Sequence, residues 1–214
     1  MNHIDTIGAI LERRIIAVIR LTDPSPLPRI AEALLEGGVT LLEITLTTPG
    51  AAEAIQQLTS EMPESIIVGA GSVLTTVQAR ACIDAGAAFI VSPVFQADIV
   101  HLCRESGTVV IPGAYTPTEI HTAHESGADF VKVFPADRLG PGFIKSVLAP
   151  MPLLRLIPTG GVTLANAESW FAAGAVAVGI GSDLVPSTTR TSDDIAAVGR
   201  VARRLVETTS AAKK

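Results

Sequence analysis

Short runs of apolar, often β-branched residues alternate along the chain with longer segments in which apolar positions recur every three or four residues. The short runs predict strands, and those without polar alternation predict strands that are covered on both faces. The longer segments predict amphipathic helices. Glycine follows many of them, where it ends a helix in the left-handed conformation. Strands that alternate with helices indicate βαβ units and a parallel sheet.

The pattern predicts eight strands and nine helices, and therefore an α/β fold. The predicted strands are Ile15–Arg20, Leu41–Leu46, Ile66–Gly69, Ala88–Ser92, Val109–Pro112, Phe130–Phe134, Leu154–Pro158 and Val176–Gly181. The predicted helices are Ile4–Arg14, Leu27–Leu35, Ala51–Ser60, Thr76–Ala85, Ala97–Glu105, Pro117–Glu125, Phe143–Leu148, Leu164–Ala172 and Asp193–Glu207.

Eight strand–helix units favour a (β/α)8 TIM barrel over an open, doubly wound sheet. A dinucleotide-binding sheet typically carries G-x-G-x-x-G after its first strand, but here the first strand runs into Leu21-Thr22-Asp23-Pro24. The pair in Gly179-Ile180-Gly181 lacks the third glycine and follows the last strand instead. We therefore expect one barrel domain over residues 1–214. The extra N-terminal helix Ile4–Arg14 is expected to close the bottom of this barrel.

The composition predicts a large apolar core and argues against several kinds of partner. Apolar residues make up 48% of the 214 residues and charged residues 17%, below the ~25% typical of soluble domains. The net charge of −5, from 16 Lys and Arg against 21 Asp and Glu, argues against a nucleic-acid partner. No apolar run approaches the ~20 residues that span a bilayer, so we expect no membrane partner. Without a signal peptide or C-x-x-C spacing, Cys82 and Cys103 are expected to be buried, reduced thiols of a cytoplasmic protein.

Lys132 is the strongest candidate for chemistry, because it lies inside a predicted strand between two valines. Successive side chains point to opposite faces of a strand, so Lys132 shares a face with Phe130 and Phe134. A lysine on the helix-facing side would be buried without a partner, and we therefore expect it in the barrel interior. An apolar setting disfavours the ammonium, and the neutral amine is what forms a Schiff base. The alternative is a structural lysine that an internal carboxylate neutralises.

The same reasoning applies to Glu43 on another predicted strand, where the alternation groups it with Leu41, Thr45 and Thr47. This polar set is expected to face the interior. Glu43 lies on the second predicted strand and Lys132 on the sixth, and alternate strands of such barrels contribute side chains to one layer. We therefore expect the two side chains to meet, with Glu43 as a general acid/base. A purely structural ion pair is the alternative.

Two glycine-rich segments follow the last two predicted strands and suggest a phosphate site. Gly160 and Gly161 follow the seventh strand, and Gly181 and Ser182 follow the eighth. Glycines let backbone N–H groups approach an anion, and these two loops form the recurrent phosphate site of TIM barrels. Tight turns without a ligand are the alternative interpretation.

No motif predicts a metal or an organic cofactor. His121 and His124 lie three residues apart on a predicted helix, but no nearby carboxylate–histidine set completes a metal site. Ser72 lies outside any G-x-S-x-G motif, so it is not predicted as a nucleophile, although it can donate a hydrogen bond from the end of strand three. We therefore expect no cofactor.

The order of motifs from about residue 15 to residue 185 resembles that of the 2-keto-3-deoxy-6-phosphogluconate (KDPG) aldolases, which also cleave 2-keto-4-hydroxyglutarate (KHG). The motifs are Leu-Glu-Ile-Thr-Leu, Gly-Ala-Gly-Ser-Val-Leu, Phe-Ile-Val-Ser-Pro, Ile-Pro-Gly-Ala, Val-Lys-Val-Phe-Pro-Ala, Leu-Gly-Pro-Gly-Phe-Ile-Lys, Pro-Thr-Gly-Gly-Val and Val-Gly-Ile-Gly-Ser. The resemblance implies a class I aldolase on a (β/α)8 barrel, a homotrimer without a metal, acting in the Entner–Doudoroff pathway.

The resemblance also implies roles for single residues. Lys132 matches the Schiff-base lysine and Glu43 the acid/base glutamate. Ser72 matches a residue near the pyruvate carboxylate, Phe134 matches the aromatic residue that flanks the pyruvyl group, and Pro93 belongs to the implied substrate-binding set. The implied phosphate-binding residues are Gly160, Gly161, Gly181 and Ser182.

One position departs from the family pattern. Many members read T-L-R-T after the glutamate, and their arginine holds the substrate carboxylate, whereas this chain has Thr47 there. Some members carry an arginine at the end of strand one instead, as this chain does at Arg20. Both residues are therefore candidates for substrate binding. Alternatively, Arg20 pairs with Glu43 or with another acidic group at the rim.

The implied reaction cleaves KDPG to pyruvate and glyceraldehyde 3-phosphate, and KHG to pyruvate and glyoxylate. An aldolase for the galactonate-derived epimer is a close alternative. A phosphosugar isomerase or epimerase, with Lys132 acting only electrostatically, is a second alternative. A non-catalytic phosphosugar-binding regulator is a third. The strand position of Lys132 favours the lyase, because a charge contact alone does not need so apolar a setting.

Overall fold

The computed structural model describes residues 2–211 and contains the strands and helices that follow. The strands are β1 (Ile15–Ile19), β2 (Leu41–Thr45), β3 (Ile67–Gly71), β4 (Phe89–Val91), β5 (Val109–Ile111), β6 (Gly113–Ala114), β7 (Val131–Val133), β8 (Leu156–Pro158) and β9 (Val178–Ile180). The α-helices are α1 (His3–Arg13), α2 (Leu27–Glu36), α3 (Ala51–Glu61), α4 (Thr76–Asp84), α5 (Ala97–Glu105), α6 (Pro117–Glu125), α7 (Pro141–Leu148), α8 (Ala167–Ala172) and α9 (Ser192–Ala211). A short 3-10 helix, η1, spans Ala136–Arg138.

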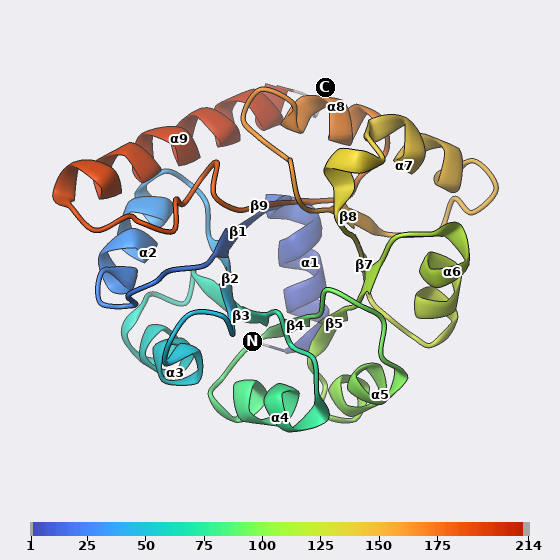
Figure 1. Ribbon diagram of the computed structural model, residues 1–214, viewed down its shortest axis with the longest axis horizontal. Coiled ribbons are helices and arrows are strands. Elements are labelled where there is room, and N and C mark those ends of the chain that lie inside the picture. Colours follow the sequence, from blue (N-terminus) through green and yellow to red (C-terminus); the bar gives the residue numbers. More distant parts are fainter. Residues whose placement is uncertain (1, 212–214) are drawn as a thin grey trace.

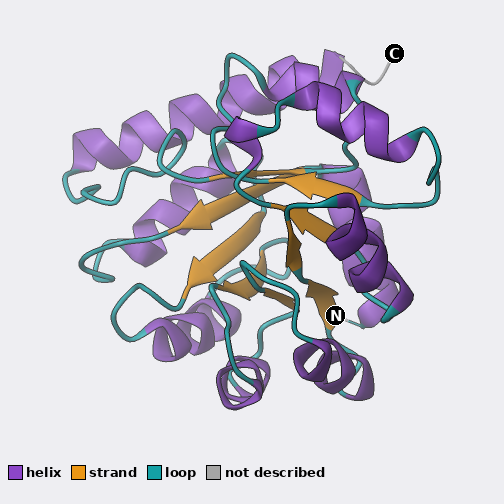
Figure 2. Ribbon diagram, turned by 45° about the vertical axis from the view of Figure 1, so that its right-hand side comes forward, coloured by secondary structure: helices purple, strands orange, loops and turns teal. Residues whose placement is uncertain are grey.

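The strands pair in parallel in two sheets, which confirms the predicted α/β class. One sheet has six strands in the order β5-β4-β3-β2-β1-β9, and the other has three in the order β6-β7-β8. An isolated parallel bridge between Thr159 and Gly179 lies where the second sheet approaches β9. Figure 1 shows the strands around a common centre with helices α2 to α9 outside them. Figure 2 shows the same helices surrounding the strands from a second direction.

Apolar side chains form two clusters, on either side of the strands. The alternation along β1 places Ile15 and Ala17 in the cluster that packs against the outer helices, while Ile16 belongs to the inner cluster. Ala9 and Ile10 of α1 also belong to the inner cluster, and Figure 1 shows α1 lying across the centre of the strands at the far end. Helix α1 therefore covers the amino-terminal ends of the strands and leaves the carboxyl-terminal ends free for a site.

The predicted fifth strand, Val109–Pro112, differs from the structure. The strand β5 ends at Ile111, and a short strand that was not predicted, β6, follows Pro112 and pairs in the other sheet. Proline has no N–H to donate to a ladder, so pairing is interrupted at this residue. The division lets the chain pass from one sheet to the other.

Helix α8 begins at Ala167, later than the predicted start at Leu164. The side chain of Asn166 explains the delay, because its Oδ1 accepts the N–H of Thr163 and its Nδ2 donates to the carbonyl of Gly161. These bonds stabilise a turn in place of the first helical turn. The other predicted helices are present with small shifts at their ends. Within residues 2–211, no helix combines the length and apolar character that crossing a bilayer requires.

Candidate active site

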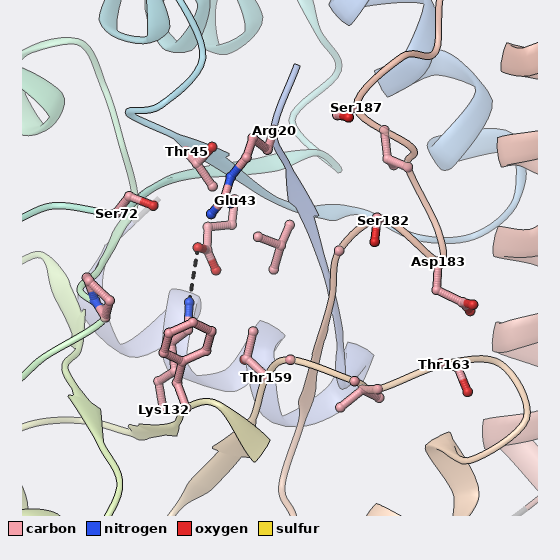
Figure 3. A pocket seen from close by; sticks show the side chains of 18 residues that line it. Arg20, Glu43, Thr45, Ser72, Lys132, Thr159, Thr163, Ser182, Asp183 and Ser187 are labelled. Carbon is pink, nitrogen blue, oxygen red and sulfur yellow. Dashed lines mark hydrogen bonds and ion pairs between the residues drawn. The ribbon is translucent and has the colours of Figure 1, made fainter. Parts of the chain in front are cut away.

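A pocket of about 590 Å³ opens at the carboxyl-terminal ends of the strands (Figure 3). Its volume lies in the range of small-molecule sites. The predicted site residues that line it are Arg20, Glu43, Ser72, Pro93, Lys132, Phe134, Gly160, Gly161, Gly181 and Ser182. The structure thus brings together residues that lie up to about 160 positions apart in the sequence. Thr47 is the exception, because it does not line the pocket.

Lys132 and Glu43 meet inside this pocket. The Nζ atom of Lys132 lies 3.4 Å from Oε1 of Glu43, and only 6% of Lys132 and 2% of Glu43 are exposed. Figure 3 shows this contact as a dashed line across the centre of the site. The ring of Phe134 completes the surroundings of the amine, with its centroid 5.3 Å from Nζ. A buried amine and carboxylate at this distance can exchange a proton directly.

Strand β3 has no side chain at Gly71, and the carboxylate of Glu43 occupies that space. A β-carbon at Gly71 would overlap the carboxylate of Glu43, so glycine here lets that carboxylate keep its place beside Lys132. The next residue, Ser72, has a positive φ of 60°, a conformation that side chains other than glycine seldom adopt. Strained backbone of this kind is concentrated at functional sites, and Ser72 directs its hydroxyl toward the pocket (Figure 3).

Arg20 is available to a ligand, whereas Thr47 is engaged elsewhere. Within residues 2–211, the Arg20 guanidinium has no ion pair or hydrogen bond, so the pairing with Glu43 considered from the sequence is not present. Figure 3 shows Arg20 and Glu43 extending from neighbouring strands toward the same part of the pocket. The hydroxyl of Thr47 lies 2.9 Å from that of Thr45. Of the two candidates for carboxylate binding, Arg20 therefore lines the pocket with its guanidinium unengaged within the described residues, whereas Thr47 lies outside the pocket.

The two predicted phosphate loops lie on one side of the pocket and are joined to each other. Gly160 and Gly161 have φ values of 91° and 72°, which favour glycine. The side chain of Asp183, beyond β9, accepts the N–H of Leu164, beyond β8, at 3.0 Å. In the part of the chain that the structure describes, the N–H groups of Gly161, Val162 and Ser182 have no hydrogen-bond partner. Unpaired N–H groups on adjoining loops are suited to binding an anion.

Several lining residues were not among the predicted site residues. They are Val18, Thr45, Thr159, Val162, Thr163, Asp183, Val185 and Ser187. The alternation along the first two strands places Val18 with Arg20 and Thr45 with Glu43, so this signal was available in the sequence. Val185 and Ser187 lie in an irregular loop without periodicity, and no sequence signal identifies them.

The described residues hold no group of three or more His, Cys, Asp or Glu side chains that could bind a metal ion. Both cysteines are free and buried. Burial raises the pKa of the Cys82 thiol to about 11 and that of the Cys103 thiol to about 12. A nearby carboxylate, Asp129, raises the pKa of Cys103 further, and Arg80 partly offsets this. Both thiols are therefore protonated at neutral pH and poor nucleophiles.

Comparison with known proteins gives consistent matches over nearly the whole chain. The family model for "KDPG and KHG aldolase" matches residues 7–201. A 2-dehydro-3-deoxy-phosphogluconate aldolase of Treponema pallidum is 38% identical over 204 residues, covering 94% of this chain and 97% of that protein. A probable 2-dehydro-3-deoxy-6-phosphogalactonate aldolase of Rhizobium meliloti is 36% identical, covering 81% of this chain and 82% of that protein.

A solved structure is also similar throughout. The KDPG aldolase of Legionella pneumophila, with pyruvate captured at low pH as a covalent carbinolamine intermediate, superposes with a TM-score of 0.86 at 28% sequence identity. The match covers 93% of this chain and 97% of that structure.

Proposed function

The chain belongs to the KDPG and KHG aldolase family and is an aldehyde-lyase, and we propose that it cleaves KDPG to pyruvate and glyceraldehyde 3-phosphate by class I chemistry. Cleavage of KHG to pyruvate and glyoxylate is part of the same proposal. The observation that carries it is the buried contact of 3.4 Å between Lys132 and Glu43, in a pocket with unpaired backbone N–H groups on one side.

The first half of the proposed reaction forms a Schiff base on Lys132. Glu43 accepts a proton from the ammonium, and the neutral amine attacks the 2-keto carbon of the substrate. Glu43 returns this proton to the hydroxyl of the resulting carbinolamine, and loss of water gives a protonated imine, which can accept an electron pair. A pyruvate carbinolamine captured in the Legionella relative supports this order of steps.

The second half breaks the carbon–carbon bond. Glu43 removes the proton of the C4 hydroxyl, directly or through a water molecule, and the C3–C4 bond breaks as its electrons move toward the imine. The aldehyde leaves, and an enamine of pyruvate remains on Lys132. Protonation at C3 and addition of water then release pyruvate and regenerate the amine.

Substrate contacts in the proposal follow from charge and position. The guanidinium of Arg20 holds the substrate carboxylate, because it lines the pocket and is unpaired within the described residues. Ser72 adds a hydrogen bond, and Phe134 and Pro93 flank the pyruvyl group. The phosphate binds to the N–H groups of the two glycine loops, formed by Gly160, Gly161, Gly181 and Ser182. Thr47 has no contact in this arrangement, although the family resemblance gives its position to the carboxylate.

The galactonate-derived epimer is a second candidate substrate. A relative with that activity in its name is 36% identical, close to the 38% of a gluconate-type relative. Both substrates present the same keto acid and phosphate, so the Lys132 chemistry is common to both. An isomerase or a binding regulator has less support, since both of these relatives are named as aldolases.

The proposed architecture is one (β/α)8 barrel domain over residues 1–214, of which Met1 and residues 212–214 lie outside the described part. Two features support closure: the chain continues from β5 into β6, and the Thr159–Gly179 bridge lies between β8 and β9. Helix α1 is proposed as the extra N-terminal helix, since Ala9 and Ile10 join the inner apolar cluster. Buried, free thiols support the proposed cytoplasmic location, where reduced cysteines are usual.

Trapping with borohydride tests the proposed chemistry. The full chain is incubated with pyruvate and sodium borohydride, digested and analysed by peptide mass spectrometry. We expect a reduced pyruvate adduct on Lys132, because only an imine is converted into a stable amine under these conditions. Lys132→Arg should abolish the adduct, and Lys145→Arg, on the exposed side of α7, should leave it unchanged. An adduct on Lys145, or none in active enzyme, would overturn the Schiff-base assignment.

A further inference from the structure

Arg20 lies just beyond the last paired residue of β1. The ladder between β1 and β2 ends with Ile19 opposite Ile44, so Arg20 and the residues after it have no strand partner. A free end of this kind leaves the direction of the next side chain undetermined unless other bonds hold the backbone. The N–H of Thr22 donates to the carbonyl oxygen of Ser187 at 3.4 Å, and two shorter bonds hold the residues directly next to Arg20.

Both of these shorter bonds involve threonines, Thr45 at the end of β2 and Thr48 in the turn that follows it. The Oγ1 atom of Thr45 donates to the carbonyl oxygen of Ile19 at 3.1 Å. The N–H of Leu21 donates to Oγ1 of Thr48, also at 3.1 Å. These hydrogen bonds hold the backbone immediately before and immediately after Arg20.

Both threonines are almost fully buried, and for this reason the loss of either bond is expected to matter. Thr45 is 1% exposed and Thr48 is 2% exposed, and Leu21 is buried as well. A buried backbone N–H that loses its acceptor has no water to replace it, so the loss is costly. The backbone around Arg20 is therefore held in one position, while the Arg20 side chain itself remains exposed to the pocket.

We propose that Thr48 and Thr45 are positioning residues. They hold the backbone on either side of Arg20 so that its guanidinium can bind the substrate carboxylate. The inference rests on the proposed function, because that function supplies the carboxylate. A guanidinium makes two parallel hydrogen bonds to a carboxylate only when its base is correctly placed. The Thr45–Thr48 segment thus serves carboxylate binding by supporting an arginine on the neighbouring strand.

Thr48 offers the clearer test, because it does not line the pocket, whereas Thr45 does. Thr48→Val keeps the shape of the side chain and removes the acceptor for Leu21. We expect the KM for the keto acid to rise roughly threefold to tenfold with little change in kcat, since a carboxylate grip acts equally on ground state and transition state. Thr48→Ser keeps the hydroxyl and should restore the original KM.

The coupling to Arg20 separates positioning from a general structural effect. Arg20→Ala should raise KM by about tenfold or more, and adding Thr48→Val to it should raise KM no further. Thr6→Val is the matched control, because Thr6 is an equally buried threonine on α1 whose hydroxyl donates to the carbonyl of Asn2, the residue before that helix. It should leave KM unchanged. Thermal unfolding of each variant verifies that it is folded at the assay temperature.

Three outcomes would overturn the proposal: an unchanged KM in folded Thr48→Val, an unchanged KM in Arg20→Ala, or an equal effect of Thr48→Val with and without Arg20. Failure of the proposed function looks different. In that case pyruvate and borohydride leave Lys132 unlabelled in the original chain. If Lys132 is labelled and the coupling is absent, the chemistry stands and only the positioning role is wrong.

Discussion

Glu43 occupies a position where one carboxylate must serve two partners. It lies 3.4 Å from the amine of Lys132 and is nearly excluded from water, so its charge is balanced mainly by that amine. In the proposed reaction, the same carboxylate faces the hydroxyl of the substrate once Lys132 has formed an imine. Under this proposal, the proximity that stabilises the pair without substrate also supplies the base during cleavage.

For Glu43→Gln we expect kcat to fall by about 10²- to 10⁴-fold, the usual effect of losing a positioned acid/base. Glutamine keeps the size of the side chain but cannot accept the C4 proton. Steady-state cleavage of KDPG, followed by release of pyruvate, measures the effect. Borohydride trapping of pyruvate on Lys132 should still occur, at a lower rate. Glu125→Gln, an exposed change on α6, is the control, and a near-normal kcat in Glu43→Gln would reduce Glu43 to a structural partner.

At the scale of elements, Asp129 joins segments that the strand ladders leave apart. Its Oδ2 accepts the N–H of Val110 in β5 at 2.9 Å, and its Oδ1 lies 3.0 Å from Nε2 of His3 in α1. Asp129 itself lies just before β7, which belongs to the other sheet. One side chain therefore connects both sheets and the helix that covers their amino-terminal ends.

Asp129→Ala should lower the free energy of unfolding by about 1–3 kcal/mol, because it leaves the buried N–H of Val110 without an acceptor. His3→Ala removes only the partly exposed contact and should cost less than about 1 kcal/mol. Urea denaturation of both variants at one pH measures the difference. An Asp129→Ala variant as stable as His3→Ala would show that water replaces the carboxylate at β5.

At the scale of the whole molecule, apolar side chains are exposed beside the pocket. Leu74 and Val77 follow β3, and Val94 follows its neighbour β4 in the six-stranded sheet. Tyr115 follows β6, the edge strand of the other sheet. Clusters of exposed apolar residues on soluble proteins commonly mark an interface with another protein. We propose that copies of this chain cover the cluster in the homotrimer that the family resemblance implies.

Light scattering coupled to size-exclusion chromatography should therefore give a molar mass of about three times the chain mass of 22.2 kDa. Val77→Asp should shift the protein toward the monomer, because burying a carboxylate in an apolar interface is unfavourable. Ile4→Asp is the matched control, since both residues are 78% exposed and Ile4 lies on α1, away from the pocket. A monomeric original chain, or dissociation by Ile4→Asp alone, would contradict this assignment.

Local sequence patterns were sufficient to predict the α/β class and to single out Lys132 and Glu43, which meet in the pocket. Alternation along a strand has a period of two, so the residues next to Lys132 and Glu43 were enough to indicate that each points away from the outer helices. The glycine pairs after the last two strands are equally local, because a left-handed backbone selects glycine wherever it occurs. Local patterns predict what depends on local geometry.

That Arg20 lines the pocket and Thr47 does not became apparent only from the folded chain, because it depends on which side chains of neighbouring strands are already engaged. Thr47 lies against Thr45, while Thr45 and Thr48 hold the backbone on either side of Arg20. The presence of β6 as a separate strand after Pro112 is also tertiary, since β5 and β6 are distinguished by their partners. Contacts between segments far apart in the sequence carry no periodic signal along the chain, so these features appear only once the strands are assembled.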